Sequence, residues 1–267
     1  MEWDSPWGVG FPGWHIECSA MSSHYLGDQF DIHCGGIDHI PIHHTNEIAQ
    51  VEALTEKQWV NYWLHGEFLV IQNEDKIDRM GKSEGNFLTL DTLKYDSIDP
   101  LAYRYFLLNA HYRHQLIFKL KAVQSAQNGF DNLKEKVIKL RAQLNESLKI
   151  QEDQVAKYNN SFLKAINDDL NTPKALAVCW QLLDDKEVNA ATKLQLLESF
   201  DSVLGLKIKE IKEEKIDIPE EITKLVKERE QARKEKNWEE ADAIRDTIDT
   251  LGYKLYDTPE GIKIGKK

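Results

Sequence analysis

Apolar side chains recur every three or four residues along much of the chain beyond residue 99, as on one face of an amphipathic helix. Further helical stretches are expected at Pro100–Ala110, at 155–170, from Thr172, and at 191–204 before Gly205. At the third of these, Thr172 would cap the helix, and the proline after it would lie in the first turn. The last three of these, together with the long helix that the stripe below predicts, are four helices with short connections, which favours a helical bundle. The longest stripe predicts one long helix through Leu120, Val123, Phe130, Leu133, Val137, Leu140 and Leu144.

The first hundred residues instead alternate between helical and extended patterns. Helices are expected at His15–Leu26 and at His44–Leu54, the second with its buried positions at Ile48, Val51 and Leu54. Strands are expected at Phe30–His33, ending at Cys34, and at Glu67–Ile71. This order predicts an α/β fold, in which ligands lie beyond the carboxyl ends of the strands. The residues placed there by the first strand are His33, Gly35, Gly36 and Asp38.

The end of the chain has a different composition. Residues 207–217 are highly charged and are expected to form a linker. Two short helices, at 218–236 and 238–251, and a hairpin built on 253–256 and 262–264 then predict a small α+β module. The predicted domains are therefore 1–98, 99–206 and 218–267, with the linker before the last. The basic residues of the 218–236 helix are as consistent with a solvated helix surface as with phosphate contacts: Lys224, Lys227, Arg229, Arg233 and Lys234.

Composition narrows the possible classes of protein. The net charge of −11, from 34 basic and 45 acidic residues, argues against nucleic-acid binding driven by overall charge but leaves room for a local basic surface. No apolar run is long enough to cross a bilayer, so no membrane partner is expected. Three scattered cysteines do not form a disulfide framework, which favours a cytoplasmic location.

One group of residues has the chemistry of a metal site. His43 and Glu47 are four residues apart and would share one face of a helix, and Cys18 would join them from a separate element. A thiolate, an imidazole and a carboxylate are ordinary zinc ligands, and three protein ligands with one open position are typical of a catalytic site. The alternatives are a solvated His–Glu face and a buried apolar cysteine. Lys82 lies in a glycine-containing loop that is either solvent-exposed or a phosphate cradle.

Several longer motifs, in this order and spacing, resemble cysteinyl-tRNA synthetase, a class I aminoacyl-tRNA synthetase. Those of the first hundred residues are Pro6–Gly8, Pro12–Met21, Asp31–Asp38, His43–Gln50 and the Arg79–Ser83 loop. Those of the helical part are Tyr103–Leu107, His111–Arg113 and Asp168–Pro173. The resemblance covers essentially the whole chain. It implies the second half of a nucleotide-binding (Rossmann-like) catalytic domain, followed by a tRNA-binding bundle and an anticodon-binding module.

The resemblance also implies a reaction and a set of site residues. Cysteine and ATP would form cysteinyl-adenylate, with Mg²⁺ expected, and the cysteinyl group would pass to tRNA(Cys). Cys18, His43 and Glu47 match ligands of one Zn²⁺ per chain, which would select the substrate thiolate over the hydroxyl of serine. The remaining roles would be shared by residues along the motifs: Trp14 and His15 in the amino-acid pocket; His33 near the substrate carboxylate and α-phosphate; Gly36, Asp38, Arg79 and Met80 at ATP; and Lys82 as the catalytic contact to the phosphates.

Departures from the family pattern limit what the chain is expected to do alone. Arg79 replaces the usual first lysine of the signature loop, Gly81 replaces a serine, and Phe11 stands where a basic residue is common. The first half of the catalytic fold, with its phosphate-binding histidine motif and a fourth cysteine ligand, has no counterpart in the sequence. We therefore expect a missing N-terminal half as a partner and no aminoacylation without it. The alternatives are a non-catalytic tRNA-binding fragment, a cysteine ligase acting on an amino-sugar and, more remotely, a hydrolytic zinc enzyme.

Overall fold

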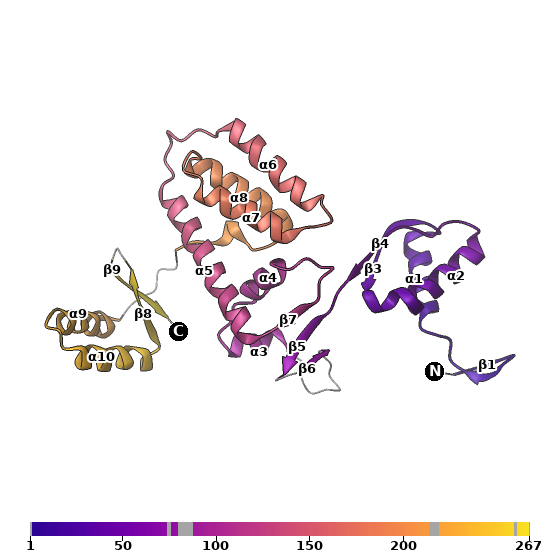
Figure 1. The fold of residues 1–267 in the computed structure, drawn as a ribbon, viewed down its shortest axis with the longest axis horizontal. Helices are drawn as coiled ribbons and strands as arrows, with labels where there is room; N and C mark the ends of the chain where they lie inside the picture. The colour runs from indigo at the N-terminus through magenta and orange to yellow at the C-terminus, as the bar shows by residue number, and fades with distance from the viewer. Residues whose placement is uncertain (1, 74–75, 80–87, 214–218, 259–260, 267) are drawn as a thin grey trace. The chain divides into compact units, whose positions relative to one another are not determined.

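The computed structural model describes residues 2–73, 76–79, 88–213, 219–258 and 261–266 (Figure 1). The chain divides into two compact units, Met1–Lys209 and Glu210–Lys267. Each unit is described by itself. Among the described residues, no helix combines the length and the apolar character that crossing a membrane requires.

The first part of unit 1 is a parallel strand pair with a crossover of helix between its strands. The antiparallel strands β1 (Trp3–Ser5) and β2 (Gly8–Gly10) precede helix α1 (His15–Leu26). Strand β3 (Phe30–Gly36) then pairs in parallel with β4 (Val60–Gly66). The connection runs through short turns of helix, η1 (Ile37–His39) and η2 (Ile40–His44), into α2 (Thr45–Thr55).

The apolar residues of this crossover form a small core of their own. Val51 of α2 packs with Trp59 and Val60, and the rings of Phe30 and Trp63 cover them. The prediction that Leu54 is buried was wrong, because its side chain is 84% exposed near the end of α2. The strand predicted to stop before the glycines also continues through them, since Gly35 and Gly36 pair with His65 and Gly66.

A second small sheet leads into the helices. Strand β5 (Leu69–Asn73) pairs antiparallel with β6 (Lys76–Arg79) and parallel with β7 (Leu116–Phe118). Helices α3 (Leu90–Tyr95) and α4 (Pro100–Leu108) lie between β6 and β7 in sequence. The Asp99 side chain caps α4 by accepting a hydrogen bond from the backbone amide of Leu101. One core cluster joins Leu93 and Ile98 to Phe106, Phe118 and Val123, so its members come from both sides of residue 98.

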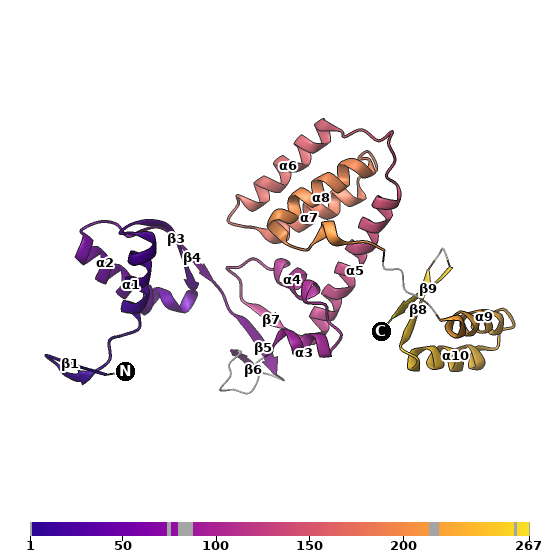
Figure 2. The same ribbon diagram turned by 180° about the vertical axis from the view of Figure 1, so that it is seen from behind.

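Four helices form the bundle that the apolar periodicity predicted (Figure 2). They are α5 (Leu120–Ala142), α6 (Glu152–Ile166), α7 (Thr172–Asp184) and α8 (Ala190–Leu204). Phe162 of α6 stacks on Phe200 of α8, with ring centroids 4.0 Å apart. The predicted threonine cap was wrong by one residue, because Asn171 is the N-cap and accepts from the backbone of Lys174. Gly205 ends α8 with φ of 63°, a left-handed conformation that glycine adopts without strain.

The predicted linker begins with an ordered turn. Ile208, in η3 (Ile208–Glu210), is buried, and the guanidinium of Arg141 donates to the carbonyl oxygens of Ile208 and Lys209. The start of this charged segment is therefore packed on unit 1.

Unit 2 contains two helices and a hairpin, as the sequence pattern predicted. Helices α9 (Glu220–Lys234) and α10 (Trp238–Thr250) pack against each other, and β8 (Tyr253–Thr258) pairs antiparallel with β9 (Gly261–Lys266). Ile222, Ile248 and Leu255 form the core. Arg229 is 5% exposed and is not part of the basic surface, whereas the other four basic residues proposed for phosphate contacts are exposed.

Candidate metal centre

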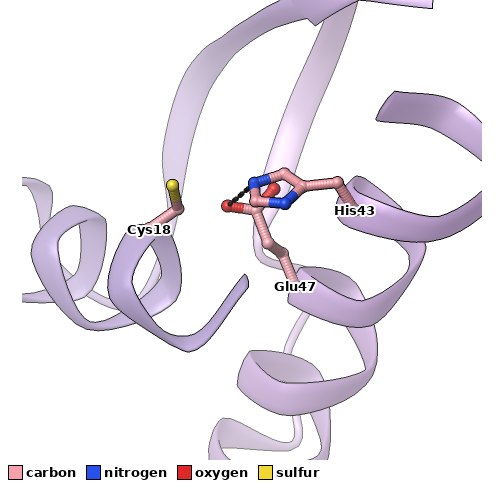
Figure 3. A group of neighbouring side chains, drawn as sticks. All are labelled: Cys18, His43 and Glu47. Atoms are coloured by element: carbon pink, nitrogen blue, oxygen red, sulfur yellow. Dashed lines mark ion pairs between the residues drawn. The ribbon is translucent and has the colours of Figure 1, made fainter. Parts of the chain in front are cut away.

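Cys18, His43 and Glu47 come together between two packed helices (Figure 3). Cys18 lies on α1, His43 at the end of η2 and Glu47 in the first turn of α2. One ligand atom from each lies within 4.8 Å of the others, and His43 Nε2 is 3.6 Å from Glu47 Oε1. Ligands around a tetrahedral zinc ion are about 3.4–3.8 Å apart, so small side-chain adjustments suffice to close this set on one ion. The structure thus brings together the three residues that the sequence singled out.

Glu47 is the unusual member of the group. Its side chain is 0% exposed, and neither carboxylate oxygen accepts a hydrogen bond. Burial raises the pKa of this carboxyl group to about 7. A buried carboxylate without hydrogen-bond partners is costly unless it is neutralised or binds a cation. The orphaned oxygens of Glu47, beside a thiol and an imidazole, therefore fit a zinc ion.

The thiol has electrostatics that are consistent with this fit. Burial, together with the negative charges of Glu47 and Glu17, raises the pKa of Cys18. The neutral thiol is accordingly the preferred form in the chain alone, and a bound divalent cation would reverse that preference by stabilising the thiolate.

Two neighbours orient the His43 ring. His15 Nδ1 and His43 Nδ1 are joined by a hydrogen bond of 2.9 Å, which directs Nε2 of His43 toward Glu47. The Trp14 ring lies over the His43 ring, with centroids 3.6 Å apart and planes inclined by 31°. Hydrogen bonds and ring contacts of this kind fix the tautomer and orientation of a metal-binding histidine. Trp14 and His15, predicted as amino-acid pocket residues, thus both contact a candidate metal ligand, and the half-exposed Trp14 also faces solvent.

Gly36 is the last residue of β3, Asp38 follows it in η1, and His33 lies in the middle of β3. His33 Nε2 is 3.2 Å from Glu47 Oε2, which places His33 beside the metal group, that is, Cys18, His43 and Glu47. Gly36 and the exposed Asp38 are in close contact, since a Cβ added to Gly36 would lie 2.5 Å from Asp38 Oδ1. Gly36 and Asp38, the predicted nucleotide-binding residues of this segment, are therefore neighbours of each other.

Three histidines that the sequence did not single out complete the cluster. His44 Nε2 is 3.8 Å from Glu47 Oε2, and His44 Nδ1 shares a hydrogen bond of 2.8 Å with His65 Nε2. The His39 ring lies 5.1 Å from that of His44. His65 reaches the site only because β4 pairs with β3 in a register that sets it opposite Gly35. This long-range pairing has no local signal in the sequence, although the His43–His44 pair could have been noted.

Only the first residue of the Arg79–Ser83 signature loop is among the described residues. Arg79 is the last residue of β6, and Met80 and Lys82 fall outside the described residues. Their roles at ATP therefore remain predictions.

A second polar cluster joins the loop after α4 to the turn between α6 and α7. Tyr112 donates its hydroxyl proton to Asp169 at 2.6 Å, and Arg113 Nε donates to the same carboxylate at 2.5 Å. These hydrogen bonds lower the pKa of Asp169 to about 2. The backbone oxygen of Tyr112 also accepts from the amide of Glu67, just after β4. Two motifs that are far apart in sequence thus hold the end of β4 to the bundle.

Models of three protein families match successive parts of the chain. Residues 1–128 match the class I (C) tRNA synthetase catalytic domain, residues 161–209 match the DALR domain, and residues 216–261 match the cysteinyl-tRNA ligase anticodon-binding domain. The fold is also similar to that of LeuRS from Agrobacterium radiobacter K84, solved as a ternary complex with tRNA and LeuAMS. That likeness has a TM-score of 0.53 at 12% identity and covers 79% of this chain and 33% of the other. The matched domains are those of a class I aminoacyl-tRNA synthetase.

Curated relatives define the family further. The chain is 46% identical to cysteine–tRNA ligase 1 of Burkholderia lata over 99% of its own length and 54% of the relative's. It is 44% identical to cysteine–tRNA ligase of Treponema denticola, over 96% of this chain and 56% of that one. The chain thus spans about half the length of these relatives. It belongs to the cysteinyl-tRNA synthetase family and corresponds to a C-terminal portion of it.

Proposed function

We propose that the chain forms the thiol-selecting and tRNA-binding part of a cysteine–tRNA ligase. The observation that carries this proposal is the buried Glu47, whose unpaired oxygens lie beside Cys18 and His43 in a chain of this family. These three residues would hold one zinc ion. Such an ion, when bound, supplies a coordination position that a cysteine thiolate fills and that a serine hydroxyl fills only at the cost of deprotonation.

The surrounding residues would orient the amino acid. Trp14 forms a wall beside His43, and His15 holds the His43 ring through its Nδ1 hydrogen bond. His33, in the middle of β3, would donate to the substrate carboxylate and to the α-phosphate. A site built around a bond that the competing substrate cannot make discriminates strongly without an editing step.

ATP would bind next to this pocket. Gly36 would let the nucleoside approach the backbone, and Asp38 would accept hydrogen bonds from the ribose. Arg79, Met80 and Lys82 would contact the phosphates, with Lys82 neutralising charge on the departing pyrophosphate alongside Mg²⁺. The cysteine carboxylate would attack the α-phosphate to give cysteinyl-adenylate, and the terminal ribose hydroxyl of the tRNA would then take the cysteinyl group. Positioning and charge neutralisation account for most of the rate enhancement in such reactions.

The partner proposed for the helical parts is tRNA(Cys). The match of residues 216–261 to an anticodon-binding domain supports tRNA over an amino-sugar as the acceptor, because an amino-sugar ligase has no use for such a domain. The relatives carry about as much chain again as this one. We therefore expect the chain to need that part of the enzyme, and not to catalyse pyrophosphate exchange or aminoacylation alone. Robust cysteine-dependent pyrophosphate exchange by the purified chain would contradict this expectation.

Zinc content of matched cysteine variants tests the site. After exhaustive dialysis, the wild-type chain should retain about one zinc ion and Cys18→Ser should lose it. Cys34→Ser, which changes an exposed cysteine outside the metal group, should retain it. Equal zinc in both variants, or none in the wild type, would remove the basis of the proposal. Salt-dependent binding of tRNA to the same samples then tests the partner.

A further inference from the structure

We propose that His33, His44 and Glu47 form a second divalent-cation site, which lies next to the zinc site and shares Glu47 with it. One ligand atom from each of these residues lies within 4.8 Å of the other two. The set contains two imidazoles and one carboxylate, a combination that binds Co²⁺, Ni²⁺ and Zn²⁺ in proteins. It contains no thiolate, which makes it chemically distinct from the first site.

The two oxygens of Glu47 belong to different donor sets. Oε1 is the atom that approaches His43, with His43 Nε2 3.6 Å away. Oε2 approaches the other two imidazoles, with His33 Nε2 at 3.2 Å and His44 Nε2 at 3.8 Å. A carboxylate can therefore bind one cation through each oxygen, and neither site needs to displace the other.

Burial favours a cation over a solvated histidine cluster. His44 is 3% exposed and Glu47 is 0% exposed, so both are shielded from bulk solvent. Although two imidazole nitrogens lie within 4 Å of Oε2, that oxygen accepts no hydrogen bond. An ion coordinated by all three atoms would satisfy the oxygen and both nitrogens at once.

The neighbours of His44 hold it in a suitable orientation. Its Nδ1 is hydrogen-bonded to His65 Nε2 at 2.8 Å, which permits the tautomer whose Nε2 lone pair faces Glu47. An outer hydrogen bond of this kind is the usual support of a metal-binding histidine. Gly35 leaves the space for the ring, because a Cβ there would lie 2.5 Å from His44 Cε1.

The second site should be the weaker one. Two divalent ions would share only the charges of one thiolate and one carboxylate, so the second ion gains less electrostatic energy. If the proposed function is correct, an ion bound to His33 would also occupy a residue needed by the substrate carboxylate. The metal count itself does not depend on the proposed function.

Titration with Co²⁺ distinguishes the two sites. The first equivalent should produce both the visible bands and the thiolate-to-metal charge-transfer band, and the second should add visible absorption alone. Cys18→Ser should lose the charge-transfer band and still bind Co²⁺ at the second site. His44→Gln should keep the thiolate-bound ion and weaken the second by more than about 10-fold. His24→Gln, an exposed histidine at the end of α1, is the matched control and should bind both ions.

Three results would overturn the proposal. The first is saturation of the wild-type chain at one Co²⁺. The second is a second equivalent that is unchanged in His44→Gln, which would assign that ion to surface histidines. The third is loss of both ions in a His44→Gln chain with wild-type circular dichroism, which would make His44 a support of a single site. Should His44→Gln misfold, the wild-type titration still decides through the second equivalent, and His33→Gln repeats the comparison.

Discussion

The packing around Gly35 yields a prediction with a built-in control. Replacing Gly35 with alanine would place a Cβ 2.5 Å from Cε1 and 2.7 Å from Nε2 of His44, and 2.8 Å from Nδ1 of His39. The ring of His44 is buried and hydrogen-bonded to His65, so it has little room to retreat. Overpacking a fixed site of this kind costs about 1–3 kcal/mol.

The same change one residue later should cost far less. At Gly36, the Cβ would meet Oδ1 of Asp38 at 2.5 Å, but this atom is the tip of an exposed side chain that is able to rotate away. The backbone of Gly36, with φ of −73° and ψ of 155°, suits alanine, and the loss of glycine's freedom in the unfolded chain offsets the contact by about 0.4–1 kcal/mol. Gly36→Ala should therefore unfold within about 0.5 kcal/mol of the wild type.

Urea unfolding of the two variants tests this contrast. The free energy of unfolding of Gly35→Ala should be about 1–3 kcal/mol below that of Gly36→Ala, measured by tryptophan fluorescence at 25 °C with unchanged m-values. Trp59 and Trp63 lie in the same crossover and report on it directly. Equal stabilities, or a more stable Gly35→Ala, would show that the His44 ring does not limit the side chain at position 35. Weaker binding of the second Co²⁺ by Gly35→Ala alone would link this packing to the proposed cation site.

Three further outcomes are expected. Zinc at 100 times its dissociation constant should raise the free energy of unfolding by about 2.7 kcal/mol. A chelator should abolish this gain, and Glu47→Gln should show none. An equal response of the wild type and Glu47→Gln would contradict the zinc site. The contacts of Asp169 with Tyr112 and Arg113 should persist above about pH 4, the ordinary carboxyl pKa, and be lost as the pH falls toward the lowered pKa of Asp169, about 2. Hydrogen exchange of residues 111–114 would detect this loss, and Asp169→Asn should remove the pH dependence. The ring of Phe162 is 2% exposed and stacked in the bundle, so Phe162→Ala should lower the free energy of unfolding by about 3–5 kcal/mol. A loss below about 1 kcal/mol in denaturant unfolding would show that the bundle repacks.

The sequence predicted elements well where the signal is local. Helix α1 begins and ends at the predicted residues, Gly205 ends α8, and the hairpin of unit 2 is present, because periodicity and glycine punctuation act within a few residues. Errors arose where packing decides. Leu54 fits the helical stripe of α2 but faces solvent, and Arg229 reads as a surface residue but is buried in unit 2.

The candidate site shows the same division. His43 and Glu47 could be paired from their spacing because a helical turn brings such residues together, and Cys18 was added from the chemistry of its thiol. His44 and His65 could not be paired, since their contact depends on the register of β3 and β4, which the chain sets over a separation of 21 residues. The hydrogen bond that orients His44 was therefore not predictable from local sequence.

Glu47 connects the energetics of the fold to its chemistry. In the chain without an ion, this carboxyl group is fully buried and its oxygens accept no hydrogen bonds, which destabilises the folded state relative to a protein with an apolar residue there. A bound cation would remove that penalty, and metal binding and folding of this region would then be coupled.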